Sequence, residues 1–200
     1  MAGSATERGY TLLEALFAVA ILAIVTVIAV PSFSALLSER RVSSSAKAFA
    51  AALRKAQAEA TARNRNVEIL FTTTEPSPTA PWSATPTAAA SAGNWLVRQT
   101  APTDASAYID GHALASQMPT VVMDATRTVV GFTPLGRPVD LSGGMLLPLA
   151  DPLVVRFTDR ATTRRYCTYL TTGGAIRTCD PIRPAGDVAS CVPHLADGAC

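Results

Sequence analysis

A long apolar run near the N-terminus is the feature that most constrains this sequence. Residues 10–30 contain a single charged side chain, that of Glu14. As an α-helix these residues would extend roughly 31 Å, which matches a bilayer hydrocarbon core of about 30 Å. A carboxylate inside such a run is costly in lipid, so Glu14 is a candidate functional residue. The run predicts a helix that crosses a membrane or packs against other helices.

The short polar segment before this run, residues 1–9, ends in Arg8 and Gly9. A secretory signal peptide has an apolar core of about 7–15 residues, followed by a cleavage site of small residues. Here the apolar run is longer, and no such site with a polar shoulder follows it. The pattern favours a helix that stays attached to the mature chain, and a simple signal anchor is the alternative.

The helical pattern continues beyond Pro31 as a narrow apolar stripe. Its members recur at intervals of three or four residues, which is the helical period: Val42, Ala46, Phe49, Leu53, Ala56 and Ala60. Asn64 and Asn66 end the pattern, as is common at a helix C-terminus. We therefore expect one helix over residues 10–64, kinked or loosened near Pro31. Its second half needs a partner surface for the stripe.

After the helix the sequence is typical of antiparallel β structure. From Val67 the apolar period changes to two, and further short strand-like segments follow, separated by turn signals. The expected strands are 67–72, 93–98, 120–123, 128–133, 153–158, 165–170 and 175–179. Residues 74–92, which are rich in Pro, Ser, Thr and Ala, and residues 101–118 are expected to be surface loops. The fold class is therefore α+β: a leader (1–9), two helix halves (10–30 and 31–65) and a β-rich head (66–200).

Four cysteines lie close together near the C-terminus, at positions 167, 179, 191 and 200. An even number in a membrane-tethered, exported chain predicts disulfides. Cys167 and Cys179 are equally distant from Gly173, so a hairpin centred there would place them opposite each other. Of the three possible connectivities we favour Cys167–Cys179 with Cys191–Cys200. No pair has the C-x₂₋₄-C spacing of a zinc site, so no metal is expected.

Signs of catalysis are missing from the sequence. It has no G-x-S-x-G, H-E-x-x-H, P-loop or dinucleotide-binding motif. His112 and His194 fall in loop-like stretches, where they are expected to be surface residues, and Asp180 is expected in a turn. The net charge of +2 argues against a strong polyanion binder as a whole. We expect neither an enzyme nor a cofactor.

The N-terminal residues resemble a type IV prepilin signature. Gly9 precedes Tyr-Thr-Leu-Leu-Glu14, and Pro31 stands where pilin helices commonly carry a kinking proline. The resemblance implies that a prepilin peptidase cleaves after Gly9 and that the new N-terminus, Tyr10, becomes N-methylated. It also implies that Glu14, the fifth mature residue, pairs with the N-terminus of a neighbouring subunit during assembly. Tyr10 departs mildly from the pattern, in which Phe is commoner.

The head is similar to minor pilins and pseudopilins of the GspH/FimT type. The matching motifs are Gly93-Asn-Trp-Leu-Val97, Val130-Gly-Phe-Thr-Pro-Leu-Gly-Arg137 and Gly174-Ala-Ile-Arg-Thr-Cys179. This similarity implies the pilin fold and a minor pilin acting in type IV pilus biogenesis. A minor pseudopilin of a type II secretion system is the alternative. Either would sit in the bacterial inner membrane with a periplasmic head, and its partners would be other pilins or pseudopilins, the lipid bilayer and an inner-membrane assembly platform.

A third hypothesis is DNA uptake. Some FimT-type pilins bind DNA through a basic C-terminal loop with a G-R-x-R-like motif. Here the matching segment, Gly174-Ala-Ile-Arg177, lacks the first arginine. Arg164, Arg165 and Arg177 are candidate phosphate ligands, which would give salt-dependent and sequence-independent binding. An ordinary charged head surface is the alternative.

Overall fold

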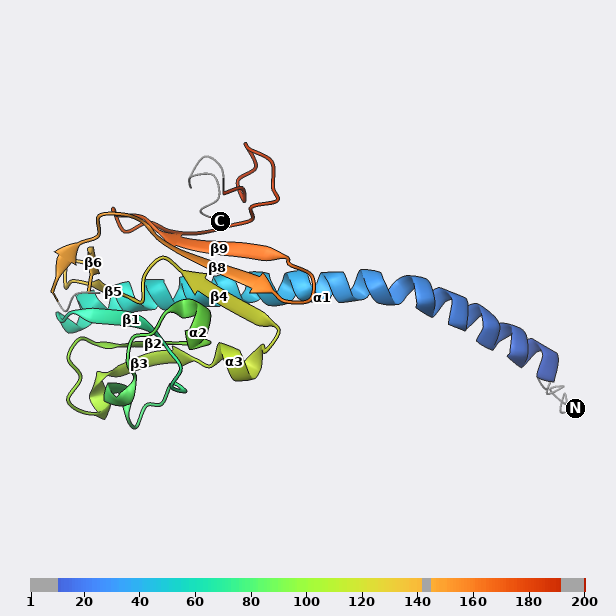
Figure 1. The fold of residues 1–200 in the computed structure, drawn as a ribbon, viewed down its shortest axis with the longest axis horizontal. Coiled ribbons are helices and arrows are strands. Elements are labelled where there is room, and N and C mark those ends of the chain that lie inside the picture. Colours follow the sequence, from blue (N-terminus) through green and yellow to red (C-terminus); the bar gives the residue numbers. More distant parts are fainter. Residues whose placement is uncertain (1–10, 142–144, 192–199) are drawn as a thin grey trace, which may run out of the picture. The chain divides into compact units, whose positions relative to one another are not determined.

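The computed structural model describes residues 11–141, 145–191 and 200, and for residues 27–32 it describes the backbone alone. The chain divides into two compact units, Met1–Leu37 and Ser38–Cys200. Each unit is described by itself below. Figure 1 gives the order of the elements.

A single helix, α1 (Leu12–Arg63), runs through both units. Thr11 caps its N-terminus, since the Thr11 hydroxyl accepts a hydrogen bond from the Glu14 backbone N–H at 3.2 Å. The helix ends at Asn64, which takes a left-handed conformation with φ 51°, while the Arg65 N–H bonds to the Ala60 carbonyl. The helix predicted over residues 10–64 is confirmed over the described residues. The backbone is helical through Pro31, and the kink there stays a prediction.

The second unit contains two antiparallel sheets beside the C-terminal half of α1 (Figure 1). The six-stranded sheet has the order β3 (Tyr108–His112), β2 (Asn94–Gln99), β1 (Val67–Thr72), β5 (Val129–Phe132), β6 (Pro138–Asp140), β7 (Leu147–Pro148). The four-stranded sheet has the order β10 (Ile176–Cys179), β9 (Arg165–Leu170), β8 (Leu153–Asp159), β4 (Val121–Ala125). Short helices lie in the connections: η1 (Pro81–Ser83), α2 (Ala89–Ala92), η2 (Ala105–Ala107) and α3 (Leu114–Gln117). This arrangement confirms the predicted α+β class.

One hydrophobic core joins both sheets to α1. All six side chains of the predicted stripe, from Val42 to Ala60, are 0% exposed. Phe49 packs at the centre, with ring centroids 5.5 Å from Phe71, 5.4 Å from Trp95 and 6.0 Å from Phe157. These rings come from β1, β2 and β8, so a single aromatic residue of the helix contacts both sheets. The stripe therefore finds the partner surface that the sequence required.

The prediction that residues 74–92 form a free surface loop is wrong. This segment contains η1 and α2, and it buries Ala84, Ala89 and Ala92. Arg98 on β2 anchors this segment. Its guanidinium pairs with the Glu68 carboxylate at 2.6 Å and donates a hydrogen bond to the Ala84 carbonyl at 2.9 Å. Ala89 and Ala92 pack in the main core with the helix stripe, whereas Ala84 packs with Leu70 and Leu96 on the other face of the six-stranded sheet. Small alanines give no periodic signal, so the sequence pattern could not reveal these contacts.

His112 is not the loop residue that the sequence predicts. It lies in β3, opposite Trp95, and its ring stacks on the indole at a centroid distance of 4.4 Å. Burial lowers the pKa of His112, an effect that the nearby Asp110 carboxylate partly offsets. Its short strand is polar and contains Gly111, which obscured the alternating pattern. His194 lies outside the described residues.

Candidate functional site

The N-terminal half of α1 exposes its apolar side chains on every side. From Leu12 to Val25 each large apolar residue is at least 55% exposed, with Leu12 at 83% and Phe17 at 59%. A helix that is apolar all round is normally surrounded by other helices or by lipid. Within the described residues of this chain, nothing covers these side chains. This half of the helix is therefore the main candidate for a contact with something outside the chain.

Glu14 is the charged side chain of this apolar segment. It lies in the first turn of α1, is exposed, and makes no ion pair with any described residue. The first turn of a helix favours an anionic side chain, because the N-terminal N–H groups carry partial positive charge. The carboxylate is thus free to meet a cation from another molecule.

Three further residues of the predicted signature have no described side chain. Gly9 and Tyr10 lie outside the described residues, and only the backbone of Pro31 is described. Within the described part of the chain, no helix has a stretch both long enough and apolar enough to cross a membrane.

The predicted phosphate ligands do not form one patch. Arg164 is half-buried, and its Nη2 lies 2.8 Å from the Asp180 carboxylate and 3.3 Å from that of Glu39. Arg165 and Arg177 are exposed, but the strand register places Arg177 opposite Tyr169. Tyr169 is four residues along β9 from Arg165, so Arg165 and Arg177 are separated by roughly 13 Å along the strand direction at the usual rise per residue.

Asp180 lies in a turn as the sequence predicts, since the Ile182 N–H donates to its Oδ1 at 3.0 Å. It is also 1% exposed and forms ion pairs with Arg164 and Arg183. Arg164, just before β9, also pairs with Glu39 of α1, so Arg164 links Asp180 to α1. Sequence reasoning missed this role because the partners lie far apart in the chain.

All four cysteines form disulfides, but the favoured pairing is wrong. The bonds join Cys167 to Cys200 and Cys179 to Cys191. The hairpin register places Cys167 opposite Cys179, as the symmetry about Gly173 predicts. However, the chain after β10 folds back, with the Asp180 N–H bonded to the Ala189 carbonyl at 2.7 Å, and this brings Cys191 to Cys179. The turn symmetry therefore predicted the register but not the bonding partner.

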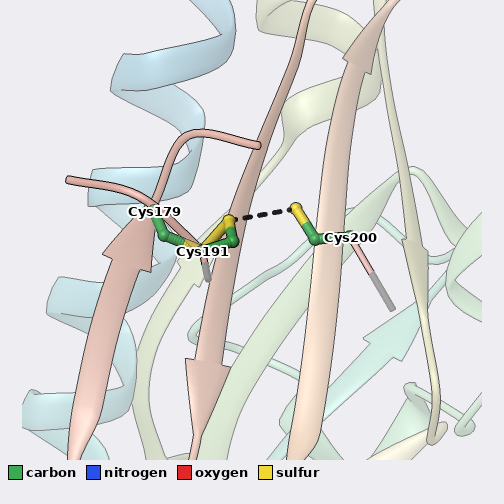
Figure 2. Close-up of side chains that lie close together, drawn as sticks. All are labelled: Cys179, Cys191 and Cys200. Atoms are coloured by element: carbon green, nitrogen blue, oxygen red, sulfur yellow. Dashed lines mark hydrogen bonds between the residues drawn. A yellow bond between two sulfur atoms is a disulfide. The ribbon is translucent and has the colours of Figure 1, made fainter. Parts of the chain in front are cut away.

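The two disulfides form one cluster of sulfur atoms on the outer face of the four-stranded sheet. Figure 2 shows Cys179, Cys191 and Cys200, whose Sγ atoms all lie within 4.8 Å of one another. Cys191 Sγ and Cys200 Sγ, in different disulfides, are 3.5 Å apart. Cys167, Cys179 and Cys191 are at most 4% exposed, whereas Cys200 is partly exposed. Because every sulfur is in a disulfide, none is a thiolate that could bind a metal in this state.

Two family models match the chain. The model of the type II transport protein GspH matches residues 45–174, and that of the prokaryotic N-terminal methylation motif matches residues 4–30. The first covers most of the C-terminal half of α1 and most of the head. The second covers Gly9, Tyr10 and Glu14.

Two solved structures are similar to the chain at low identity. The type IV minor pilin FimU of Pseudomonas aeruginosa is 16% identical, with 69% of this chain and 87% of that chain covered and a TM-score of 0.46. The minor pseudopilin EpsH from the Type 2 Secretion System of Vibrio cholerae is 10% identical, with 72% and 99% covered and a TM-score of 0.49. No curated protein matches the chain.

Proposed function

Because the chain belongs to the GspH family and is a minor pilin or minor pseudopilin, we propose that it is a structural subunit that enters its filament through the N-terminal half of α1. The observation that supports this most directly is the apolar surface of that half, exposed on every side around a single carboxylate. Such a surface is stable in lipid or among similar helices. The proposed role is non-enzymatic and needs no cofactor.

In the proposed mechanism the helix moves from lipid to protein. The precursor waits in the inner membrane with its head in the periplasm, and the prepilin peptidase removes residues 1–9. The assembly platform then brings the helix against those of other pilins. Apolar side chains such as Leu16 and Phe17, more than half exposed in the single chain, become buried between helices. Packing between helices replaces contact with lipid.

Glu14 would set the register of this assembly. A charge in an apolar environment is tolerated only when it is paired, and the amino group that cleavage would create on a neighbouring subunit is a suitable partner cation. That amine belongs to residue 10, four positions before Glu14. Two helices offset by about 6 Å along their axes would bring the two groups together.

Two substitutions test this mechanism at separate steps. We expect Gly9→Ala to block cleavage, seen as a slower-migrating precursor in a gel. We expect Glu14→Gln to be cleaved normally but to be largely absent from sheared filaments, while Glu14→Asp keeps partial incorporation because it keeps the charge. Normal processing of Gly9→Ala, or normal incorporation of Glu14→Gln, would contradict the proposal.

We assign the filament to a type IV pilus, in which the chain would act in biogenesis as an assembly and adaptor subunit. The support is the hairpin segment from Gly174 to Arg177, which stands at the position of the G-R-x-R-like motif of FimT-type pilins, although it lacks the first arginine. Deletion of the gene is expected to reduce surface pili and leave type II secretion of exoproteins unchanged. The reverse result would place the chain in a secretion pseudopilus instead.

We do not extend the proposal to DNA uptake. Two carboxylates already neutralise Arg164, and Arg165 and Arg177 lie apart along the hairpin. Binding of the full chain to duplex DNA at about 50 mM salt, lost in Arg165→Gln/Arg177→Gln, would restore that hypothesis.

A further inference from the structure

The geometry points to a thiol–disulfide exchange site at the sulfur cluster, where an external thiolate converts one disulfide pairing into another. The starting pairing is Cys167–Cys200 with Cys179–Cys191. The product is Cys167–Cys179 with Cys191–Cys200. Both new pairs are already neighbours: Cys167 and Cys179 face each other across β9 and β10, and the sulfurs of Cys191 and Cys200 are 3.5 Å apart (Figure 2).

The first step occurs at Cys200. Cys200 is the only one of the four cysteines that is partly exposed, so we place the attack of the external thiolate at its Sγ. Attack there forms a mixed disulfide between the external sulfur and Cys200. The bond to Cys167 breaks, and its electron pair leaves on the Cys167 sulfur as a thiolate.

The second and third steps occur between residues of the chain. The Cys167 thiolate attacks Cys179 Sγ, its direct cross-strand neighbour, and the Cys179–Cys191 bond breaks to leave a Cys191 thiolate. Cys191 then attacks Cys200 Sγ, and the external thiolate is released. The number of disulfides is unchanged and the external thiol is regenerated, so it acts as a catalyst and no oxidant or reductant is consumed.

The exchange changes how the C-terminal segment is held. In the starting pairing, Cys191 is bonded to β10 and Cys200 to β9. In the product one disulfide lies within the hairpin and the other within the segment, so no disulfide joins the two. The described contacts that remain are noncovalent, such as the ion pair between Arg164 and Asp180 and the packing of Cys191 against Val154 and Tyr169. The segment would then leave the outer face of the sheet more easily, and the small apolar cluster around Val154 and Tyr169 would lose part of its cover.

Disulfide mapping of the full chain in detergent tests the exchange. Trypsin cleaves after Arg165 and Arg177, and Asp-N cleaves before Asp180, Asp187 and Asp197, so each cysteine falls on its own peptide. The protein is incubated at mildly alkaline pH with a small amount of reduced glutathione, alkylated and mapped. S-methylglutathione, which has no thiol, is the control.

We expect the 167–179 and 191–200 linked peptides to appear together and in equal amounts with glutathione, and to be absent with the control. Asp-N cleavage of the native protein before Asp187 should become faster in parallel. Only the starting pairs, or a third pairing of Cys167–Cys191 with Cys179–Cys200, would overturn the inference.

Two single substitutions isolate the internal steps without any catalyst. Cys200→Ser leaves a Cys167 thiol beside the Cys179–Cys191 bond, and we expect a 167–179 link to appear. Cys179→Ser leaves a Cys191 thiol beside the Cys167–Cys200 bond, and we expect a 191–200 link. If a folded variant keeps only its original bond, the corresponding step is excluded. If a variant fails to fold, the wild-type mapping still decides.

Discussion

The two halves of α1 belong to one uninterrupted helix and yet have opposite surfaces. In the C-terminal half, residues 38–63, one stripe is completely buried, with Phe49 and Leu53 at 0% exposure. In the N-terminal half, residues 12–37, Leu16 and Phe17 are each 59% exposed. The difference follows from the arrangement of side chains, because charged residues recur along the C-terminal half, whereas Glu14 is the single charged residue of the N-terminal half. A stripe fits one core, whereas a helix that is apolar all round requires other molecules.

The largest expected difference between the two halves appears when one phenylalanine in each is replaced by alanine. Phe49→Ala should lower the free energy of unfolding of the head by about 3–5 kcal/mol, because Phe49 is fully buried among rings from both sheets. Phe17→Ala should leave it unchanged within about 0.5 kcal/mol, because the side chain is exposed in the single chain. Denaturant unfolding of the full chain in detergent, followed by Trp fluorescence, measures both.

Phe17→Ala should instead reduce the incorporation of the chain into filaments. A chain with an intact head but fewer apolar contacts along its assembly helix should be less abundant in sheared filaments. If Phe17→Ala destabilised the head as much as Phe49→Ala, the separation between the two halves would be wrong.

The sequence predictions were accurate where the apolar residues form a regular pattern and failed where they do not. The stripe was predicted residue by residue, because the helical period reports which side faces a core. Seven strands were predicted close to their observed positions, because their apolar residues recur between turns. β3, the short strands β6 and β7, and the alanine-rich segment over residues 74–92 were missed, because none of them contains an alternating or helical pattern. The disulfide pairing failed for a related reason, since it depends on how the C-terminal segment folds back over β9 and β10 rather than on any local signal.

A smaller difference is expected when one alanine in each half is replaced by the larger leucine. Ala56 is 0% exposed and lies in the stripe, so Ala56→Leu should destabilise the head by about 1–3 kcal/mol through overpacking. Ala18, which is exposed, has space around it in the single chain, and Ala18→Leu should not change the unfolding of the head. The same denaturant experiment compares the two, and equal stability of both variants would mean that the stripe is loosely packed.

The smallest expected effect is a pH dependence of the stability of the core that packs against the C-terminal half of α1. His112 stacks on Trp95, which itself contacts Phe49, and burial lowers the pKa of His112 below its usual value. The buried Nε2 has no hydrogen-bond partner among the described residues, so a proton there would have nothing to bond with. The unfolded chain therefore binds this proton more readily than the folded one, and stability is lost as the pH falls from above 6.5 through the lowered pKa.

His112→Phe keeps an aromatic ring against Trp95 and removes the titration. We expect the stability of the wild-type protein relative to this variant to decline between pH 7.5 and pH 5, measured as a small difference in Tm. Trp fluorescence of the folded wild-type protein should change over the same range and stay constant in the variant. The same comparison between Phe17→Ala and Phe17→Ala/His112→Phe should give an equal pH dependence, because a titration in the core acts on the C-terminal half of α1 alone. A pH dependence that differed between the two backgrounds would mean that the exposed half also contributes to the stability of the head.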